Sequence, residues 1–173
     1  MKIIFLDFDG VLNSNNLLDT ADLHRPETSE ELELLESLSI TSSNARLAVR
    51  HIDPTMVSHL NTIIAATAAN VIISTAWRKL FSMAELEGIL KFHGFKGTIV
   101  DRTPITFGYR PRNLEIYSWF QSNTEEPLEV TNFVILDDLH IAGENYPDNF
   151  VNTDPDIGLT RDEAEKAIAI LNG

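Results

Sequence analysis

The sequence has no cysteine among its 173 residues. Disulfides, thiolate nucleophiles and cysteine-ligated metal sites are therefore excluded, and a reducing cytoplasm is the compartment we expect. The five histidines are scattered and show no paired metal-ligand spacing. Without thiolates or paired imidazoles, a zinc site is not expected.

Basic residues are also scarce. Lysine and arginine number 13 against 26 aspartates and glutamates, which gives a formal net charge of −13. Because phosphate backbones attract basic surfaces, we expect no extended nucleic-acid surface. A local basic pocket and a cation held by carboxylates are both compatible with this charge.

Long hydrophobic runs are missing as well. The apolar stretch "IIFL" near the N-terminus is too short for a signal peptide, and no later stretch is long enough to span a membrane. A hydrophobic content of 43% with 23% charged residues is nevertheless typical of a globular protein. The length favours a single domain over residues 1–173.

What the sequence does contain is an alternation of strand and helix patterns. Apolar runs predict strands at 2–7, 70–75, 97–101 and 131–138, with a last edge strand at 149–154. Helical spacing and capping residues predict helices at 28–38, 53–69, 82–94, 110–122 and 160–173. Residues 13–16 and 39–44 have loop-like composition. This alternation predicts an α/β fold of three layers, a parallel sheet between two layers of helices.

Polar residues gather where three of these strands end. Ligands of parallel α/β sheets bind beyond the carboxyl ends of the strands, so these residues are candidates for a site. They are Asp7 and, two positions later, Asp9; Ser74 and Thr75; and Asp137 with Asp138. Neighbouring carboxylates repel and resist desolvation, so a cation between them would explain why they are held together.

Mg2+ is the cation that this set of residues favours. It binds through one or two carboxylates, keeps several waters and leaves a position for a substrate phosphate. Near such an ion one aspartate stays ionised as a nucleophile, while a neighbour acts as general acid. Hydroxyl and basic groups would stabilise the charge on the transferring phosphoryl oxygens.

The stretch "DFDGVLN" resembles the first motif of the haloacid dehalogenase (HAD)-like hydrolases, phosphatases with an aspartate nucleophile. The resemblance implies a Rossmann-like fold in which Asp7 forms an aspartyl-phosphate. Asp9 would be the general acid and base, and its backbone carbonyl would bind Mg2+.

Three further stretches resemble the remaining motifs. "VIIST" is similar to the second, which assigns phosphate binding to Ser74, with Thr75 as the alternative. "FVILDD" is similar to the fourth, whose paired acids, here Asp137 and Asp138, hold the metal. For the third, "RPRNLEIYSWF" offers Arg112 or Arg110, where many family members have lysine.

The order of "FLDFDGVLNS", "ISTAWR", "RNLEIYSWF", "FVILDD" and "TDPDIGLT" resembles the HAD domain of Swiss-Army-knife RNA-repair proteins. Residues 14–50 fall outside the resemblance and stand where the superfamily inserts a flap or a minimal cap. The expected function is hydrolysis of phosphoric monoesters, with Mg2+ as cofactor and a phosphorylated small molecule or nucleic-acid end as substrate. A polynucleotide or nucleotide end-processing phosphatase and a non-catalytic binding or regulatory module are the alternatives.

Three residues near these motifs have two interpretations each. Arg78 could contact phosphate or brace the acidic cluster as a structural ion pair. Trp77 and Trp119 are expected to pack in the core or at its rim rather than to stack on bases.

Overall fold

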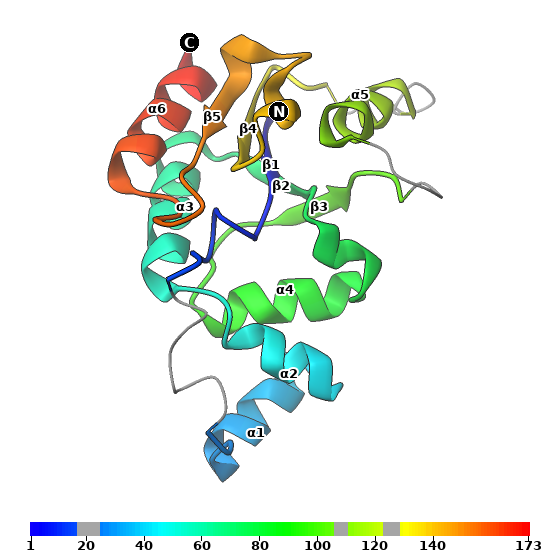
Figure 1. Ribbon diagram of the computed structural model, residues 1–173, viewed down its shortest axis with the longest axis vertical. Helices are drawn as coiled ribbons and strands as arrows, with labels where there is room; N and C mark the ends of the chain where they lie inside the picture. Colours follow the sequence, from blue (N-terminus) through cyan, green and yellow to red (C-terminus); the bar gives the residue numbers. More distant parts are fainter. Residues whose placement is uncertain (17–24, 106–110, 123–128) are drawn as a thin grey trace.

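A parallel β-sheet forms the centre of the fold. The computed structural model describes residues 1–16, 25–105, 111–122 and 129–173. Its strands are β1 (Lys2–Leu6), β2 (Asn70–Ile73), β3 (Ile99–Arg102), β4 (Asn132–Asp137) and β5 (Phe150–Asn152), in the order β3-β2-β1-β4-β5. Every adjacent pair is parallel, and β1 lies at the centre (Figure 1). The predicted parallel α/β sheet is thus confirmed.

The helices are α1 (Ser29–Ser37), α2 (Ser43–Val49), α3 (Pro54–Thr67), α4 (Met83–Phe92), α5 (Arg112–Ser122) and α6 (Arg161–Asn172). Four of the helices, α1, α3, α4 and α6, begin at the capping residues that the sequence predicts. Capping boxes pair Thr28 with Glu31 and Thr160 with Glu163, which satisfies otherwise unpaired backbone N–H groups. In the described part of the chain, no helix combines the length and the apolar character needed to cross a membrane.

Alternate residues of β1 point to opposite faces of the sheet, as a strand requires. Ile4 and Leu6 belong to a large core cluster to which α3, α4 and α6 contribute. Ile3 and Phe5 belong to a second cluster with residues of α5. Helices therefore cover both faces of the sheet, which is the predicted three-layer arrangement.

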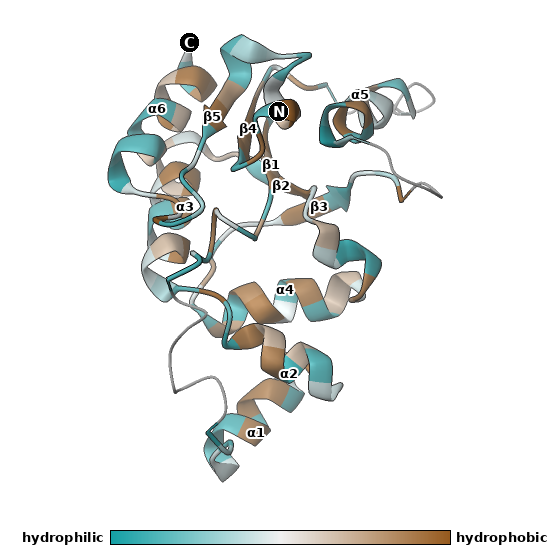
Figure 2. Ribbon diagram, viewed as in Figure 1, coloured by the Kyte–Doolittle hydropathy of each residue, from teal (hydrophilic) through white to brown (hydrophobic). Residues whose placement is uncertain are grey.

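The helix α2 lies partly in a stretch predicted to be loop. Ser42 caps it by accepting a hydrogen bond from the Ala45 N–H group, so the serine-rich tract starts a helix. The helix is short, and it is stabilised by burial of Ala45, Ala48 and Val49 rather than by its propensity. Figure 2 shows apolar residues where α1, α2 and α4 meet. The described part of residues 14–50 therefore packs on α4.

Gly88 allows this packing. It lies inside α4, and a Cβ atom there would overlap the carbonyl oxygen of Leu38 and lie 3.0 Å from Ile40 Cγ1. Alanine in a helix gains about 1 kcal/mol over glycine in propensity. Overlap with backbone outweighs that gain, so Gly88→Ala is expected to lower the free energy of unfolding by about 1–3 kcal/mol. Urea denaturation measures the change, and Lys91→Ala, on the exposed face of α4, is the control.

Candidate active site

The pairing of the central strands places three polar residues side by side. Leu6 is paired with Ile73 on one side and with Leu136 on the other. The next residue on each strand end is therefore level with the others: Asp7, Ser74 and Asp137. Backbone hydrogen bonds extend the alignment, because Asp7 N donates to Leu136 O at 3.0 Å and Ser74 N to Leu6 O at 2.9 Å.

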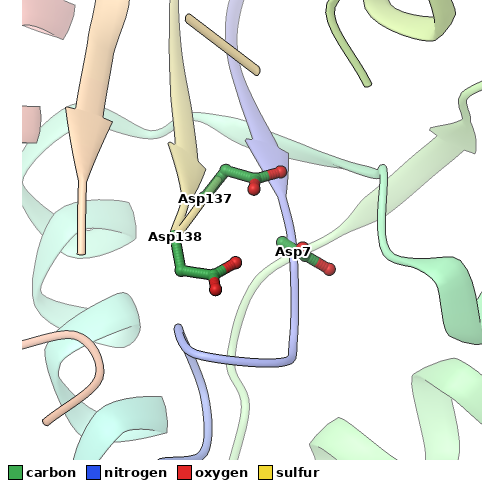
Figure 3. Close-up of side chains that lie close together, drawn as sticks. All are labelled: Asp7, Asp137 and Asp138. Carbon is green, nitrogen blue, oxygen red and sulfur yellow. The ribbon is translucent and has the colours of Figure 1, made fainter. Parts of the chain in front are cut away.

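Three carboxylates converge at this edge. Asp7, Asp137 and Asp138 each offer an oxygen within 4.8 Å of the others (Figure 3). Burial, with the nearby charge of Asp7, raises the pKa of Asp137 to about 8, and the same two causes raise the pKa of Asp138. Folding thus brings together negative charges that disfavour one another. A hard cation with oxygen ligands is the group that would relieve this repulsion, so the set fits Mg2+.

Gly10 permits the close approach of the first loop to this cluster. Its φ is +68°, a conformation that other residues rarely adopt, and a Cβ atom would lie 2.7 Å from Asp138 Cβ. The glycine of the first motif therefore brings the loop after β1 against the acidic pair.

Arg112 is a buried cation in contact with the cluster. Its Nη1 atom lies 2.9 Å from Asp7 Oδ2 and 2.6 Å from Asp137 Oδ2, and the side chain is 8% exposed. Burial acts to lower the pKa of Arg112, but Asp7 and Asp137 outweigh it and raise the pKa. The guanidinium group therefore stays charged. Of the two arginines considered from the sequence, Arg110 lies outside the described residues.

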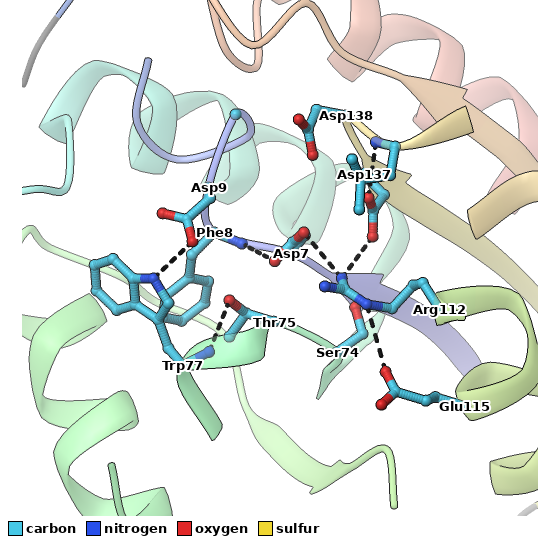
Figure 4. Close-up of polar contacts among 12 residues, drawn as sticks. Asp7, Phe8, Asp9, Ser74, Thr75, Trp77, Arg112, Glu115, Asp137 and Asp138 are labelled. Carbon is cyan, nitrogen blue, oxygen red and sulfur yellow. Dashed lines mark hydrogen bonds and ion pairs between the residues drawn. The ribbon is translucent and has the colours of Figure 1, made fainter. Parts of the chain in front are cut away.

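Two further charged residues, Glu115 and Arg78, help to hold Arg112 in place. Glu115, buried one turn along α5, has its Oε2 atom 3.6 Å from Arg112 Nε (Figure 4). The same atom lies 2.6 Å from Arg78 Nη2. Arg78 also donates to the carbonyl oxygens of Ser74, Thr75 and Thr103. The Arg78 guanidinium is thus occupied by contacts within the protein. Of its two interpretations, the structure supports the structural ion pair rather than contact with phosphate. Sequence patterns gave no sign of Glu115.

The two candidate hydroxyls differ in their availability. Ser74 is fully buried, and its Oγ atom has no hydrogen-bond partner among the described residues. Thr75 Oγ accepts a hydrogen bond from the Trp77 N–H group and caps the short 3-10 helix Ala76–Lys79. A buried polar atom without a partner is costly, so Ser74 is the hydroxyl that a ligand would satisfy.

The carboxylate of Asp9 lies apart from the other three. It accepts a hydrogen bond from Trp77 Nε1 at 2.8 Å and another from Asn13 Nδ2 at 3.0 Å, and it points toward the indole (Figure 4). The side chain is thus separate from the candidate metal ligands, whereas the backbone carbonyl is the group that the motif assigns to the metal. Asn13 was not singled out from the sequence.

The tryptophans pack as expected and also donate hydrogen bonds. The Trp77 ring contacts Phe8 and Phe81 edge-on, and Trp119 packs against Phe5. Trp119 Nε1 donates to Asp101, just as Trp77 Nε1 donates to Asp9. The sequence predicted the packing, whereas the hydrogen bond from Trp77 into the site was missed.

Comparison with known protein families gives one match. The family model for the HAD domain in Swiss Army Knife RNA repair proteins matches residues 3–164, a range that includes all the candidate site residues. No curated protein and no solved structure in the comparisons matches the chain. The match covers most of the chain, and the chain therefore belongs to the family of HAD domains found in Swiss Army Knife RNA repair proteins.

Proposed function

We propose that the protein is a Mg2+-dependent phosphoric monoester hydrolase that works through an aspartyl-phosphate on Asp7. Family membership supports a hydrolase of the phosphatase-like kind. The observation that carries the proposal is the convergence of Asp7 with Asp137, Asp138 and the Arg112 cation at the strand ends. A carboxylate nucleophile, oxygen ligands for a divalent cation and a positive charge for phosphoryl oxygens are what this chemistry needs.

The reaction would take two steps. A carboxylate oxygen of Asp7 attacks phosphorus, and the bond from phosphorus to the leaving oxygen breaks as Asp9 gives that oxygen a proton. Water then attacks the phosphorus of the aspartyl-phosphate while Asp9 takes a proton from it. Breakage of the bond from phosphorus to the Asp7 oxygen releases phosphate and restores the carboxylate.

The remaining residues would bind the phosphoryl oxygens and the metal ion. Arg112 and the Ser74 hydroxyl would hold phosphoryl oxygens, with Thr75 as the alternative hydroxyl. The side chains of Asp7, Asp137 and Asp138 and the backbone carbonyl of Asp9 would hold Mg2+. When bound, the ion would neutralise charge on the phosphoryl group and on the acidic cluster.

The effect of Mg2+ on thermal stability gives a test of the metal site that does not depend on turnover. Replacing Asp138 by asparagine removes one of the converging charges, so the metal-free variant is expected to unfold a few degrees above wild type near neutral pH. The raised pKa of Asp138 means that its ionised form is disfavoured in the folded protein. The advantage should therefore fade toward acidic pH, where the carboxyl is protonated in both states.

The same variant should lose most of the stabilisation that Mg2+ gives to wild type. Thermal unfolding with Mg2+ and with chelator measures both effects. Asp148→Asn, which changes the same charge at an exposed position, is the control. An undiminished response of Asp138→Asn to Mg2+ would remove Asp138 from the metal site.

The direct experiment is phosphate release from p-nitrophenyl phosphate, followed by a panel of small phosphomonoesters. Turnover that requires Mg2+ and stops with excess chelator supports the proposal. Turnover that continues in chelator would contradict the metal requirement. Magnesium binding without turnover on any phosphoester would favour the non-catalytic module instead.

A nucleic-acid end is the second candidate substrate, and the family description favours it because it refers to RNA repair proteins. The net charge of −13 opposes it unless a partner supplies a basic surface. A salt-sensitive preference for 3′- or 5′-phosphorylated oligonucleotides over mononucleotides would support this function. Equal rates on both would count against it.

We further propose that residues 1–173 act as one HAD-like domain in which residues 14–50 serve as a flap or minimal cap. Packing of α1 and α2 on α4 supports an insertion that is integrated with the core. A deletion of the insertion that left substrate selectivity unchanged would argue against a flap.

A further inference from the structure

The general acid of the proposed reaction is held from two sides. Each oxygen of the Asp9 carboxylate accepts one hydrogen bond, Oδ2 from Trp77 Nε1 at 2.8 Å and Oδ1 from Asn13 Nδ2 at 3.0 Å. Asp9 itself is exposed. An exposed aspartate normally samples several rotamers, so a pair of donors on its two oxygens selects one of them.

Both donors are themselves fixed. The Trp77 ring packs edge-on against Phe8 at 5.4 Å and against Phe81 at 5.9 Å, and Thr75 Oγ accepts a hydrogen bond from its backbone N–H group. Asn13 is buried, and its Oδ1 atom accepts a hydrogen bond from Gly10 N at 2.9 Å. The donors therefore impose their geometry on Asp9, because they are more constrained than the side chain they bind.

The position in which Trp77 and Asn13 hold the Asp9 carboxylate suits a general acid and not a metal ligand. A freely rotating Asp9 carboxylate would be drawn toward a cation among Asp7, Asp137 and Asp138, and toward Arg112. There it would compete as a ligand instead of facing the leaving oxygen. The indole and the amide hold it away from that cluster, on the far side of the loop after β1 (Figure 4).

We propose that Trp77 is a positioning residue that, with Asn13, holds the Asp9 carboxylate where it can protonate the leaving oxygen. The inference rests on the proposed function, because it needs Asp7 as nucleophile and Asp9 as acid. Trp77 touches the acid and not the reacting phosphorus, so its contribution depends on how much the leaving oxygen needs a proton.

Leaving-group dependence provides the test. p-Nitrophenolate departs readily without a proton, whereas unsubstituted phenolate is more basic and relies on the acid. Trp77→Phe keeps an aromatic ring beside Phe8 and removes the N–H donor. We expect kcat/KM of this variant to fall at least about tenfold more for phenyl phosphate than for p-nitrophenyl phosphate. Asp9→Asn should show the same bias more strongly.

Two further variants isolate the N–H group. Incorporation of β-(3-benzothienyl)alanine at position 77 replaces the indole N–H by sulfur with little change of shape, and it should reproduce the bias even if Trp77→Phe folds poorly. Trp119→Phe is the matched control, because it removes an indole N–H that donates to Asp101 outside the site, so it should leave the ratio of the two substrates at the wild-type value.

The outcomes separate the inference from the function it rests on. Equal losses on both substrates in the two position-77 variants would make Trp77 a merely structural residue and overturn the inference. The proposed phosphatase function would still stand in that case, provided that wild type turns over and Asp7→Asn is inactive. An unchanged substrate ratio in Asp9→Asn would remove the general acid, and the positioning role with it. Absence of phosphoester turnover in wild type would overturn both.

Discussion

Replacing Asp7 by asparagine is expected to reduce phosphate release from p-nitrophenyl phosphate by at least about 10³-fold. Asp7 is 3% exposed, and it comes directly after the central strand with its Oδ2 atom 2.9 Å from Arg112 Nη1. Asparagine has nearly the same shape, and its carbonyl oxygen can still accept the hydrogen bond that Phe8 N donates to Asp7 Oδ1. It lacks the anionic oxygen that must attack phosphorus, so the loss should be chemical.

Mass spectrometry of acid-quenched protein adds a direct readout. Wild type should carry a phosphoryl group on the peptide that contains Asp7, and Asp7→Asn should not. Circular dichroism and thermal unfolding show whether the variant is folded. Turnover that survives in folded Asp7→Asn, or a phosphoryl group on another residue, would transfer the role of nucleophile elsewhere.

The position of the site could be predicted because it follows from strand ends. Three apolar runs end in polar residues, and the alignment of Leu6 with Ile73 and Leu136 makes those ends coincide. A parallel sheet leaves little freedom here, since its strands share one direction and their carboxyl ends share one edge. The fold and the convergence of Asp7 with Asp137 and Asp138 were therefore accessible from one sequence.

The contacts that orient these residues could not be predicted from the sequence. The hydrogen bond from Trp77 to Asp9 joins residues 68 positions apart, and Arg112 reaches Asp137 across 25. Such contacts depend on how the 3-10 helix and α5 pack on the sheet, which no local pattern specifies. No sequence pattern pointed to Glu115, which is buried between two arginines.

Removing the charge of Arg112 is expected to have the largest effect on stability. Arg112→Met keeps much of the side-chain volume but leaves Asp7 and Asp137 buried without their cation. Breaking a buried ion pair from one side typically costs about 3–5 kcal/mol, and we expect a loss of that size in metal-free protein near neutral pH. Phosphate release should also fall sharply, because Arg112 is the proposed ligand of phosphoryl oxygens.

The pH and the metal should both modify that loss in a known direction. The pKa of Asp137 is about 8 with Arg112 present, and Arg112 acts to lower it, so the variant should raise it further. Above about pH 8 the wild type ionises Asp137, whereas the variant still resists this ionisation, so the deficit of Arg112→Met should grow as the pH rises above about 8. Mg2+ should recover part of the stability at neutral pH by supplying positive charge to the same carboxylates.

Arg112→Lys separates charge from geometry. An ammonium group can still pair with Asp7 and Asp137, but it lacks the planar fork with which arginine also approaches Glu115. We expect the lysine variant to recover most of the stability that methionine loses, and to keep turnover at a reduced kcat. Urea denaturation with and without Mg2+, beside phosphate-release rates, provides the comparison. A lysine variant as unstable as Arg112→Met would mean that the packing of the guanidinium on α5, rather than its charge, stabilises the acidic cluster.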